Sequence, residues 1–262
     1  MSDDRLLLTV ENGIATLTLN RPAAGNSIDM PMAEALLAAA IRFDQDPAIR
    51  CVLLTGAGRL FCAGGDVGSF ASVGDEAPAF LSELAGKLHM AVSRLMRMPK
   101  PLVVAVNGAA AGAGLSLAIA GDVVIAGASA SFTAAYGAIG LTPDGGMSWL
   151  LPRLVGMRHA QEMILCNSKV DAARAAEIGL VSRTVADADL LAEAQAQADR
   201  LANGATAAIG GARALLLASY DGAFEAQLER ETRSITAAGR TGEFREGLSA
   251  FQQRRKPDFR SA

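Results

Sequence analysis

The chain has few of the residues that usually carry disulfide or metal chemistry. Its 262 residues include three cysteines and two histidines, and no two cysteines form a Cys-x-x-Cys pair. An odd cysteine count without such pairs argues against a disulfide framework and predicts small buried side chains in a reducing compartment. Because the histidines are also few and scattered, the sequence predicts neither a metal site nor a cofactor held by such residues.

An excess of charge of either sign is also missing. The 24 Lys and Arg residues are nearly balanced by 27 Asp and Glu residues, and no basic stripe is visible, which argues against a nucleic-acid partner. The start, Met1–Arg5, is polar and leads directly into an apolar run, so we expect no signal peptide. The longest uncharged stretch, Leu102–Gly121, contains Asn107 and four glycines, which favours strand, turn and helix over one membrane span. We therefore expect a cytoplasmic protein without a membrane partner.

Short β-rich runs and helical patterns alternate along the first part of the chain, and helical patterns dominate the rest. Asn12-Gly13 predicts a hairpin, and Asp29 a helix N-cap. This order predicts an α/β core over residues 1–200, followed by a helical region over residues 201–262. The expected strands are Leu6–Val10, Ile14–Leu19, Cys51–Leu54, Leu102–Val106, Val123–Ala126 and Ser131–Thr133. The expected helices are 29–45, 78–98, 115–120, 147–154, 158–165, 171–178, 187–201, 206–218, 224–238 and 242–253.

Two turns of small residues, Phe61–Asp66 and Asn107–Gly114, each follow an apolar strand. Residues without bulk let a backbone N–H group approach a ligand closely, and two such groups aimed at one point would form an oxyanion hole. The alternative is that the glycines only allow close packing. A dinucleotide-binding fingerprint is disfavoured, because Leu117 stands where the third glycine is required.

Five stretches of the sequence form a pattern that covers nearly the whole chain. They are 17–22 with Asn26, 58–66, 105–118, 140–146 with 151–153, and 246–251 with Arg255, Pro257 and Phe259. Together, and in this order, they resemble the crotonase (enoyl-CoA hydratase/isomerase) superfamily. The resemblance implies a spiral of β-β-α turns with a C-terminal helical trimerisation region, and a homotrimer or hexamer built as a dimer of trimers. It also implies an acyl-CoA thioester as the substrate, with CoA as part of the substrate and not a cofactor.

The same resemblance assigns residues to the binding of that thioester. It places the two oxyanion donors at the backbone N–H groups of Gly65 and Ala113, and the second of these lies at a predicted helix start. The segment Ala63, Gly64, Gly65, Asp66 and Val67 would border the CoA moiety, although a helix N-cap is an alternative role for Asp66. The basic residues Arg254, Arg255 and Lys256 would meet CoA phosphates or simply form a solvated tail.

The residues expected to act on the substrate differ from those of the best-known relatives. Hydratases of the superfamily use two glutamates, and the corresponding positions hold Ser116 and Tyr136, neither of which is a base near pH 7. Both are expected to contact the substrate. Asp144 occupies the position used by isomerases that act through one aspartate, and the nearest pattern is that of epoxyphenylacetyl-CoA isomerases of phenylacetate breakdown. An acid at this position can remove and return a proton while an oxyanion hole holds the enolate.

Other interpretations of these residues remain open in the sequence. Asp144 is also a suitable N-cap for the following helix, and His89 suits a packed or surface position better than a catalytic one. A hydratase with a non-standard acid/base and a non-catalytic acyl-CoA-binding homologue are the alternatives to an isomerase. Dehalogenation is disfavoured, because Tyr136 stands where the related dehalogenases carry Trp. Phe70, Phe80 and Leu81 are candidates for the wall of the acyl pocket, and fatty acid metabolism or phenylacetate degradation is the expected setting.

Overall fold

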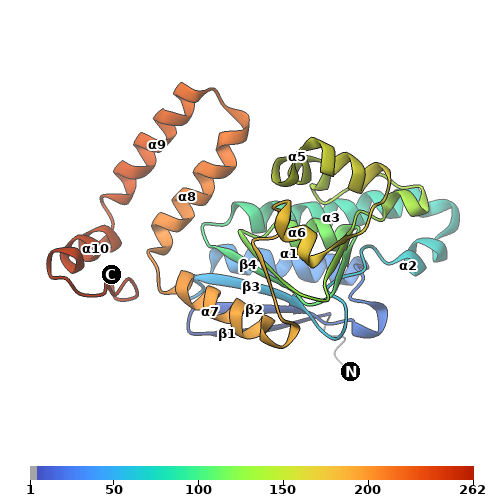
Figure 1. Ribbon diagram of the computed structural model, residues 1–262, viewed down its shortest axis with the longest axis horizontal. Coiled ribbons are helices and arrows are strands. Elements are labelled where there is room, and N and C mark those ends of the chain that lie inside the picture. Colours follow the sequence, from blue (N-terminus) through green and yellow to red (C-terminus); the bar gives the residue numbers. More distant parts are fainter. Residues whose placement is uncertain (1–4) are drawn as a thin grey trace.

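The computed structural model describes residues 5–262, and its largest element is a six-stranded sheet (Figure 1). The polar start at residues 1–4 lies outside the described part. Across the sheet the strands are β1 (Leu6–Glu11), β2 (Ile14–Leu19), β3 (Cys51–Gly56), β4 (Leu102–Val106), β6 (Val123–Gly127) and β9 (Arg183–Val185). β1 and β2 are antiparallel, and every later pairing in this sheet is parallel. A smaller sheet contains β5 (Ala109–Ala111), β7 (Ser131–Thr133) and β8 (Val170–Asp171).

The hairpin between β1 and β2 forms at the predicted turn. Asn12 and Gly13 adopt φ angles of +50° and +74°, as a two-residue turn with both central residues in the left-handed region requires. The turn sets the register in which Leu6 pairs with Leu19 and Glu11 with Ile14. The predicted hairpin is therefore confirmed.

Both faces of the parallel sheet are covered by helices, as is typical of such sheets. Along β3, Val52 and Leu54 face the main core, whereas Cys51 and Leu53 face a second cluster against α7 (Leu190–Ala202). The buried residues of α7 include alanines at a spacing of four, which lie on one face and let the helix approach the strands: Ala194, Ala198 and Ala202.

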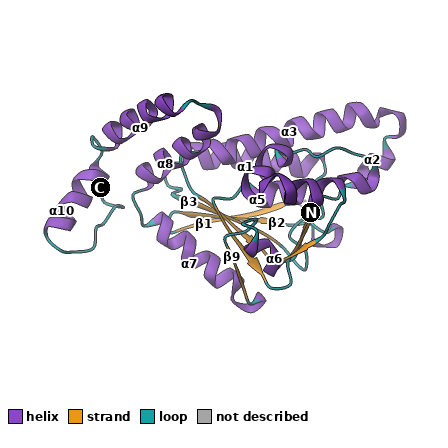
Figure 2. Cartoon of the chain, turned by 45° about the horizontal axis from the view of Figure 1, so that its top comes forward, coloured by secondary structure: helices purple, strands orange, loops and turns teal. Residues whose placement is uncertain are grey.

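The opposite face of the sheet is covered by α1 (Met30–Gln45) and α3 (Ala77–Arg97), which pack against each other (Figure 2). The side chain of Asp29 accepts a hydrogen bond from the Met32 N–H group at 2.9 Å, so the predicted N-cap is confirmed. The other helices are α2 (Val67–Ser72), α4 (Ala113–Ile119), α5 (Met147–Leu165), α6 (Ala172–Glu177), α8 (Thr206–Ala218), α9 (Phe224–Ala238) and α10 (Gly242–Gln252). Short 3-10 turns cover Pro22–Ala24, Gly74–Glu76, Tyr136–Ile139, Asp187–Asp189 and Ser219–Asp221.

The predicted α/β class is confirmed, and the differences are local. The two helices expected at 147–154 and 158–165 form one element, α5, which is interrupted at Gly156, where φ is +78°. Four short elements were not predicted from the sequence: α2, β5, β8 and β9. Three of these four are strands of two or three residues, which is too few for a periodicity to be visible.

The last three helices extend away from the sheet (Figure 1). They are tied to residues that flank the strands, because the Arg50 guanidinium donates to Phe259 O at 3.1 Å and the Arg213 guanidinium of α8 donates to Asp122 Oδ1 at 2.8 Å. A division of the chain at residue 200 stays a prediction. Within residues 5–262 no single helix is long and apolar enough to cross a membrane; one pair bent by 103°, Asp187–Ala202 with Thr206–Asp221, meets the requirement by length and composition only.

Candidate active site

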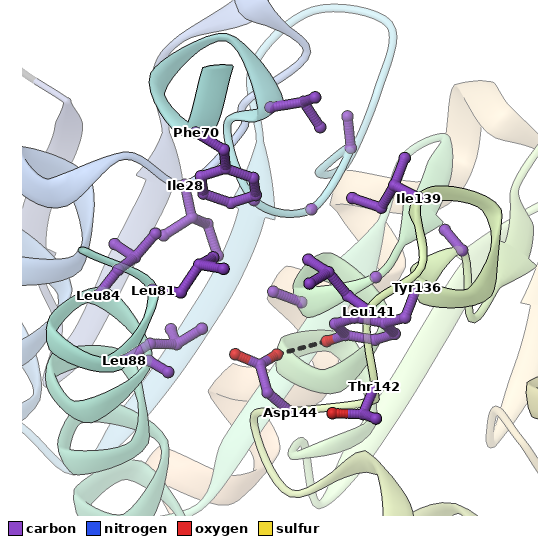
Figure 3. A pocket seen from close by; sticks show the side chains of 18 of the residues that line it. Ile28, Phe70, Leu81, Leu84, Leu88, Tyr136, Ile139, Leu141, Thr142 and Asp144 are labelled. Carbon is purple, nitrogen blue, oxygen red and sulfur yellow. Dashed lines mark hydrogen bonds between the residues drawn. The ribbon is translucent and has the colours of Figure 1, made fainter. Parts of the chain in front are cut away.

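A cavity of about 590 Å³ lies between α3 and the segment 136–144 (Figure 3). One wall is formed by Leu81, Leu84 and Leu88 of α3, and the opposite wall carries Tyr136 and Asp144. Among the described residues that line it, only Asp144 has a charged side chain. The cavity therefore combines a largely apolar interior with a single carboxylate.

The first of the two small-residue turns is held in shape by Asn26, which is fully buried. The Asn26 amide donates to Leu60 O at 2.8 Å and to Ala57 O at 2.9 Å, and its oxygen accepts from the Arg21 N–H group at 2.8 Å. The Arg21 guanidinium in turn pairs with the Asp66 carboxylate at 2.9 Å. These contacts fix the turn from the side that faces away from the cavity.

Backbone hydrogen bonds join the first turn to the second. Cys62 N–H donates to Ala109 O at 3.2 Å, and Ala111 N–H donates to Cys62 O at 2.9 Å. A Cβ atom added at Gly114 would lie 2.3 Å from Cys62 O, so a side chain at that position would force the turns apart. Close packing is thus the role of this glycine.

The two expected oxyanion donors, Gly65 and Ala113, both line the cavity. Ala113 begins α4, so its N–H group has no acceptor within the helix. Within residues 5–262 neither N–H group takes part in a backbone hydrogen bond. Gly64 adopts φ +102°, and a Cβ atom added there would lie 3.5 Å from Ala113 N, so the two donor segments lie side by side. Close packing therefore accounts for Gly114, and an oxyanion role of the Gly65 and Ala113 N–H groups stays a prediction.

Tyr136 and Asp144 lie on the same wall of the cavity and are hydrogen-bonded to each other. The Tyr136 hydroxyl donates to Asp144 Oδ1 at 2.5 Å (Figure 3). Burial raises the pKa of Tyr136 well above its usual value, and the Asp144 charge and this hydrogen bond raise it further. The phenol thus stays protonated and acts as a donor. The Asp144 side chain is 28% exposed, and its other oxygen, Oδ2, lies 3.7 Å from His89 Nε2.

The interpretation of Asp144 as a helix N-cap is wrong. Gly146 occupies the cap position of α5, and Met147 N–H donates to the backbone oxygen of Asp144 at 3.1 Å. Gly145 and Gly146 adopt φ angles of +61° and +85°, a geometry that glycine readily supplies. The chain therefore turns into the helix while the carboxylate points into the cavity (Figure 3).

Most of the predicted site residues meet at this cavity, but Asp66, Ser116 and Phe80 do not line it. Asp66 caps α2 by accepting from Ser69 N–H at 3.2 Å; burial opposes ionisation, but Arg21 and this bond hold the pKa of Asp66 below its usual value. Ser116 is buried beneath the wall and contacts the backbone of Asp144. The predicted residues that do line the cavity are Ala63, Gly64, Gly65, Val67, Phe70, Leu81, Ala113, Tyr136 and Asp144. Phe80 packs edge-on against Phe70, with ring centroids 6.2 Å apart.

Several residues of the cavity wall were not predicted from the sequence. Leu84 and Leu88 follow Leu81 at spacings of three and four, so the helical periodicity of α3 contained the signal that places them on one face. The other missed residues come from segments without such a period: Ile28, Ile139, Leu141 and Thr142.

The basic C-terminal residues follow α10, which lies at the end of the molecule away from α3 (Figures 1 and 2). Arg255 forms a two-pronged ion pair with Glu246 at 2.6 and 2.8 Å, which with other bonds lowers the pKa of Glu246 to about 2. Arg254 and Lys256 are exposed. A role of the three cations toward CoA stays a prediction. Within residues 5–262, no three His, Cys, Asp or Glu side chains are grouped as a metal site would require.

Fold and cavity together define an α/β protein in which Gly65, Ala113 and one carboxylate line a largely apolar cavity, and in which neither backbone N–H group has a backbone acceptor within residues 5–262. This arrangement suits proton transfer beside a carbonyl group, because the N–H groups can stabilise the oxyanion while the carboxylate moves the proton.

Comparison with known proteins identifies the family. A family profile described as enoyl-CoA hydratase/isomerase matches residues 9–262. The chain is 39% identical to the 1,2-epoxyphenylacetyl-CoA isomerase of Escherichia coli K12, with 97% of each chain covered. It is 40% identical to a "probable enoyl-CoA hydratase" of Rhodobacter capsulatus, with 99% of each covered. An enoyl-CoA hydratase structure from Polaromonas sp. JS666 superposes with a TM-score of 0.92 at 33% identity, covering 97% of this chain and 98% of that one. The chain belongs to the enoyl-CoA hydratase/isomerase family and has its crotonase fold.

Proposed function

We propose that this protein is an acyl-CoA isomerase in which Asp144 moves a proton along the acyl chain. The observation that carries the proposal is that Asp144 has the one charged side chain among the described residues that line a cavity, and that Gly65 and Ala113 line the same cavity. Family membership supports hydratase or isomerase activity on acyl-CoA thioesters, and the single carboxylate favours the isomerase.

The proposed reaction needs one group that both takes and returns a proton. The Asp144 carboxylate removes a proton from a carbon of the acyl chain, and the electron pair of that C–H bond moves toward the thioester carbonyl. The Gly65 and Ala113 N–H groups stabilise the resulting enolate oxygen. Asp144, now protonated, returns the proton to a different carbon, so no further reactant is consumed.

The two positions at which related hydratases carry glutamates support this choice. Ser116 lies beneath the wall, where its hydroxyl donates to a backbone oxygen, and Tyr136 is held protonated. Neither side chain can accept a proton from water near neutral pH. Two-acid hydration is therefore disfavoured.

The cavity wall also favours an uncharged acyl group. Apolar side chains from α3, from Phe70 and from Leu141 surround the carboxylate, and no basic side chain among the described lining residues could pair with a second acid. An unpaired carboxylate on the substrate would lose its hydration there at a cost of several kcal/mol. The acyl group is therefore expected to be aliphatic or aromatic. The similarity to an epoxyphenylacetyl-CoA isomerase supports an aromatic group.

The variant Asp144→Asn tests the assignment. It keeps the size of the side chain and removes the base, so solvent deuterium uptake into a panel of acyl-CoA esters should fall by about 10²–10⁴-fold. Dissociation constants from calorimetry should stay within about threefold, because the carboxylate is not expected to bind the CoA portion. Full turnover by this variant would refute the role of Asp144. Tight ester binding without exchange by the wild-type protein would instead indicate a non-catalytic homologue.

A hydratase in which Asp144 alone activates water is the second candidate, supported by the 40% identical "probable enoyl-CoA hydratase". The two reactions give different products from one substrate. Incubation with crotonyl-CoA separates them, because hydration adds a hydroxyl group, whereas isomerisation moves the double bond without a change in mass. We expect no hydroxylated product.

We also propose that the protein assembles as a homotrimer or a dimer of trimers through α8–α10, as the family resemblance implies. No residue of α9 is buried, and three of its apolar side chains are exposed: Phe224, Leu228 and Ile235. Such exposed apolar area is typical of an interface. Native mass spectrometry should show three or six chains, and a monomer at micromolar concentration would contradict the proposal.

A further inference from the structure

The peptide group between Asp144 and Gly145 is hydrogen-bonded at both polar ends. Ser116 Oγ donates to the carbonyl oxygen of Asp144 at 2.8 Å, and the Gly145 N–H group donates to His89 Nε2 at 3.0 Å. This carbonyl and this N–H belong to one planar unit, so the peptide cannot rotate without breaking at least one of the two bonds. The orientation of that plane sets the direction in which the Asp144 side chain leaves the backbone.

The close approach of this peptide to Ser116 depends on the glycine. Gly145 adopts φ +61°, and a Cβ atom added there would lie 2.8 Å from Ser116 Cβ. The two hydrogen-bonding partners come from different elements, since Ser116 lies on α4 and His89 on α3. The peptide is thus held between two helices that the main core keeps in place.

The bond to His89 requires one protonation state of the imidazole. Nε2 accepts the Gly145 N–H only when it carries no proton, so the ring must be neutral with its proton on Nδ1. A protonated ring would lose this bond and would instead direct an N–H group at Asp144 Oδ2, 3.7 Å away. The other charged groups beside His89 are Arg97 of the same helix and Asp221 of the turn Ser219–Asp221, which line one hollow with it. Tyr136 holds the opposite oxygen of Asp144.

We propose that Ser116 and His89 are positioning residues that aim the Asp144 carboxylate, and that His89 does so only as a neutral Nε2 acceptor. The inference rests on the proposed function, because it assigns the aim of the base that performs the proton transfer. It gives His89 a role that does not require contact with the substrate, and it explains why Ser116 lies beneath the cavity wall rather than in it.

The test compares two variants of His89 with a control variant of His159, the second histidine of the chain. In His89→Gln, the amide oxygen can accept the Gly145 N–H without titrating, whereas His89→Phe has no acceptor. We expect His89→Phe to lower kcat by about three- to tenfold, the size of one neutral hydrogen bond, with KM within about twofold. His89→Gln should restore most of kcat. Its kcat should also lack the part of the decline at acidic pH that protonation of the imidazole causes in the wild type. The control His159→Gln, on α5, should match the wild type.

A second measurement does not depend on activity. Only two Asp-Gly pairs occur in the sequence, Asp144-Gly145 and Asp221-Gly222, so labelling aspartate carbonyls with ¹³C and glycine nitrogens with ¹⁵N gives two linked amide signals. Asp221→Glu removes one and thereby assigns the other to Gly145. We expect the Gly145 amide shift to follow the titration of His89, and to be flat over the same pH range in His89→Gln.

The outcomes separate this inference from the proposed function. A Gly145 amide that ignores the His89 titration, or a His89→Phe variant with wild-type kcat, overturns the positioning role. Full turnover by Asp144→Asn overturns the isomerase assignment instead, and the amide titration then still reports whether the peptide is held as described.

Discussion

The two walls of the cavity are built differently. The α3 wall consists of leucines on one face of a long helix, whose backbone hydrogen bonds are satisfied within the helix. The wall from Tyr136 to Asp144 begins with a 3-10 turn and continues as an irregular segment, so side-chain hydrogen bonds hold it in place: Tyr136 to Asp144, Ser116 to Asp144 and Gly145 to His89. In the proposed isomerase, this difference would let the regular wall select the acyl group while the irregular wall performs the chemistry.

Among the changes that keep Asp144 itself, the largest effect is expected on the polar wall, from Tyr136→Phe. This change removes the hydroxyl that donates to Asp144 Oδ1 at 2.5 Å while keeping the ring. A hydrogen bond to a charged group contributes about 1.5–3 kcal/mol, so kcat should fall by about 10- to 100-fold, with little change in KM. Steady-state kinetics on the best substrate of the ester panel measures both. A kcat equal to that of the wild type would show that the polar wall does not depend on this bond.

A smaller effect is expected from Leu81→Ala on the apolar wall, and it should change KM and not kcat. Leu81 lines the cavity and is only half-buried, so the change removes contact area for the acyl group without emptying the core. The lost contact is of the order of 1–2 kcal/mol, which should raise KM by about 5- to 30-fold and leave kcat nearly unchanged. Met90→Ala is a matched control, because Met90 is an exposed apolar residue of the same helix that does not line the cavity. A fall in kcat for Leu81→Ala would contradict the division between the walls.

The smallest effect concerns stability at high pH. The folded protein keeps the proton of Tyr136 more tightly than the unfolded chain, whose tyrosines titrate near pH 10. The contribution is therefore complete below about pH 10 and is lost as the pH rises further, because the unfolded chain then releases a proton that the folded state retains. Between about pH 9 and pH 11, the free energy of unfolding should fall by roughly 1 kcal/mol more in the wild type than in Tyr136→Phe. Equilibrium denaturation in urea at both pH values measures this, and equal declines would rule it out.

Much of the fold was predictable because its signals are local. Leu102–Val106 reads as a buried strand from its run of apolar residues, and α9 matches its predicted bounds, Phe224–Ala238. The oxyanion segments were also predictable as short small-residue turns after such strands. The interruption at Gly156 was predicted as a break between two helices, because sequence shows where a helical pattern stops and not how the pieces join.

The supporting contacts of the site could not be predicted in the same way. His89 and Gly145 are 56 residues apart, and the amphipathic pattern of α3 places His89 on the helix without showing which backbone group it meets. The preference for Asp144 as an N-cap reflects the general frequency of Asp at caps; the two glycines that follow it override that preference by providing a cap of their own. Such outcomes depend on tertiary approach, which no single segment encodes.

The hydrogen bonds that join Cys62 to Ala109 and Ala111 have a consequence for how such a protein can diversify. Because these bonds join the two turns, a substitution that moves the Gly65 or the Ala113 N–H group is expected to displace both, and with them a thioester carbonyl bound as proposed. The side chains at positions 116, 136 and 144 contact one another and make none of these bonds, so in the proposed enzyme they can be exchanged while the turns stay joined. A new reaction on this scaffold would therefore be reached by changing the catalytic acid and the side chains that hydrogen-bond to it. The proposed binding site of the thioester carbonyl would stay the same.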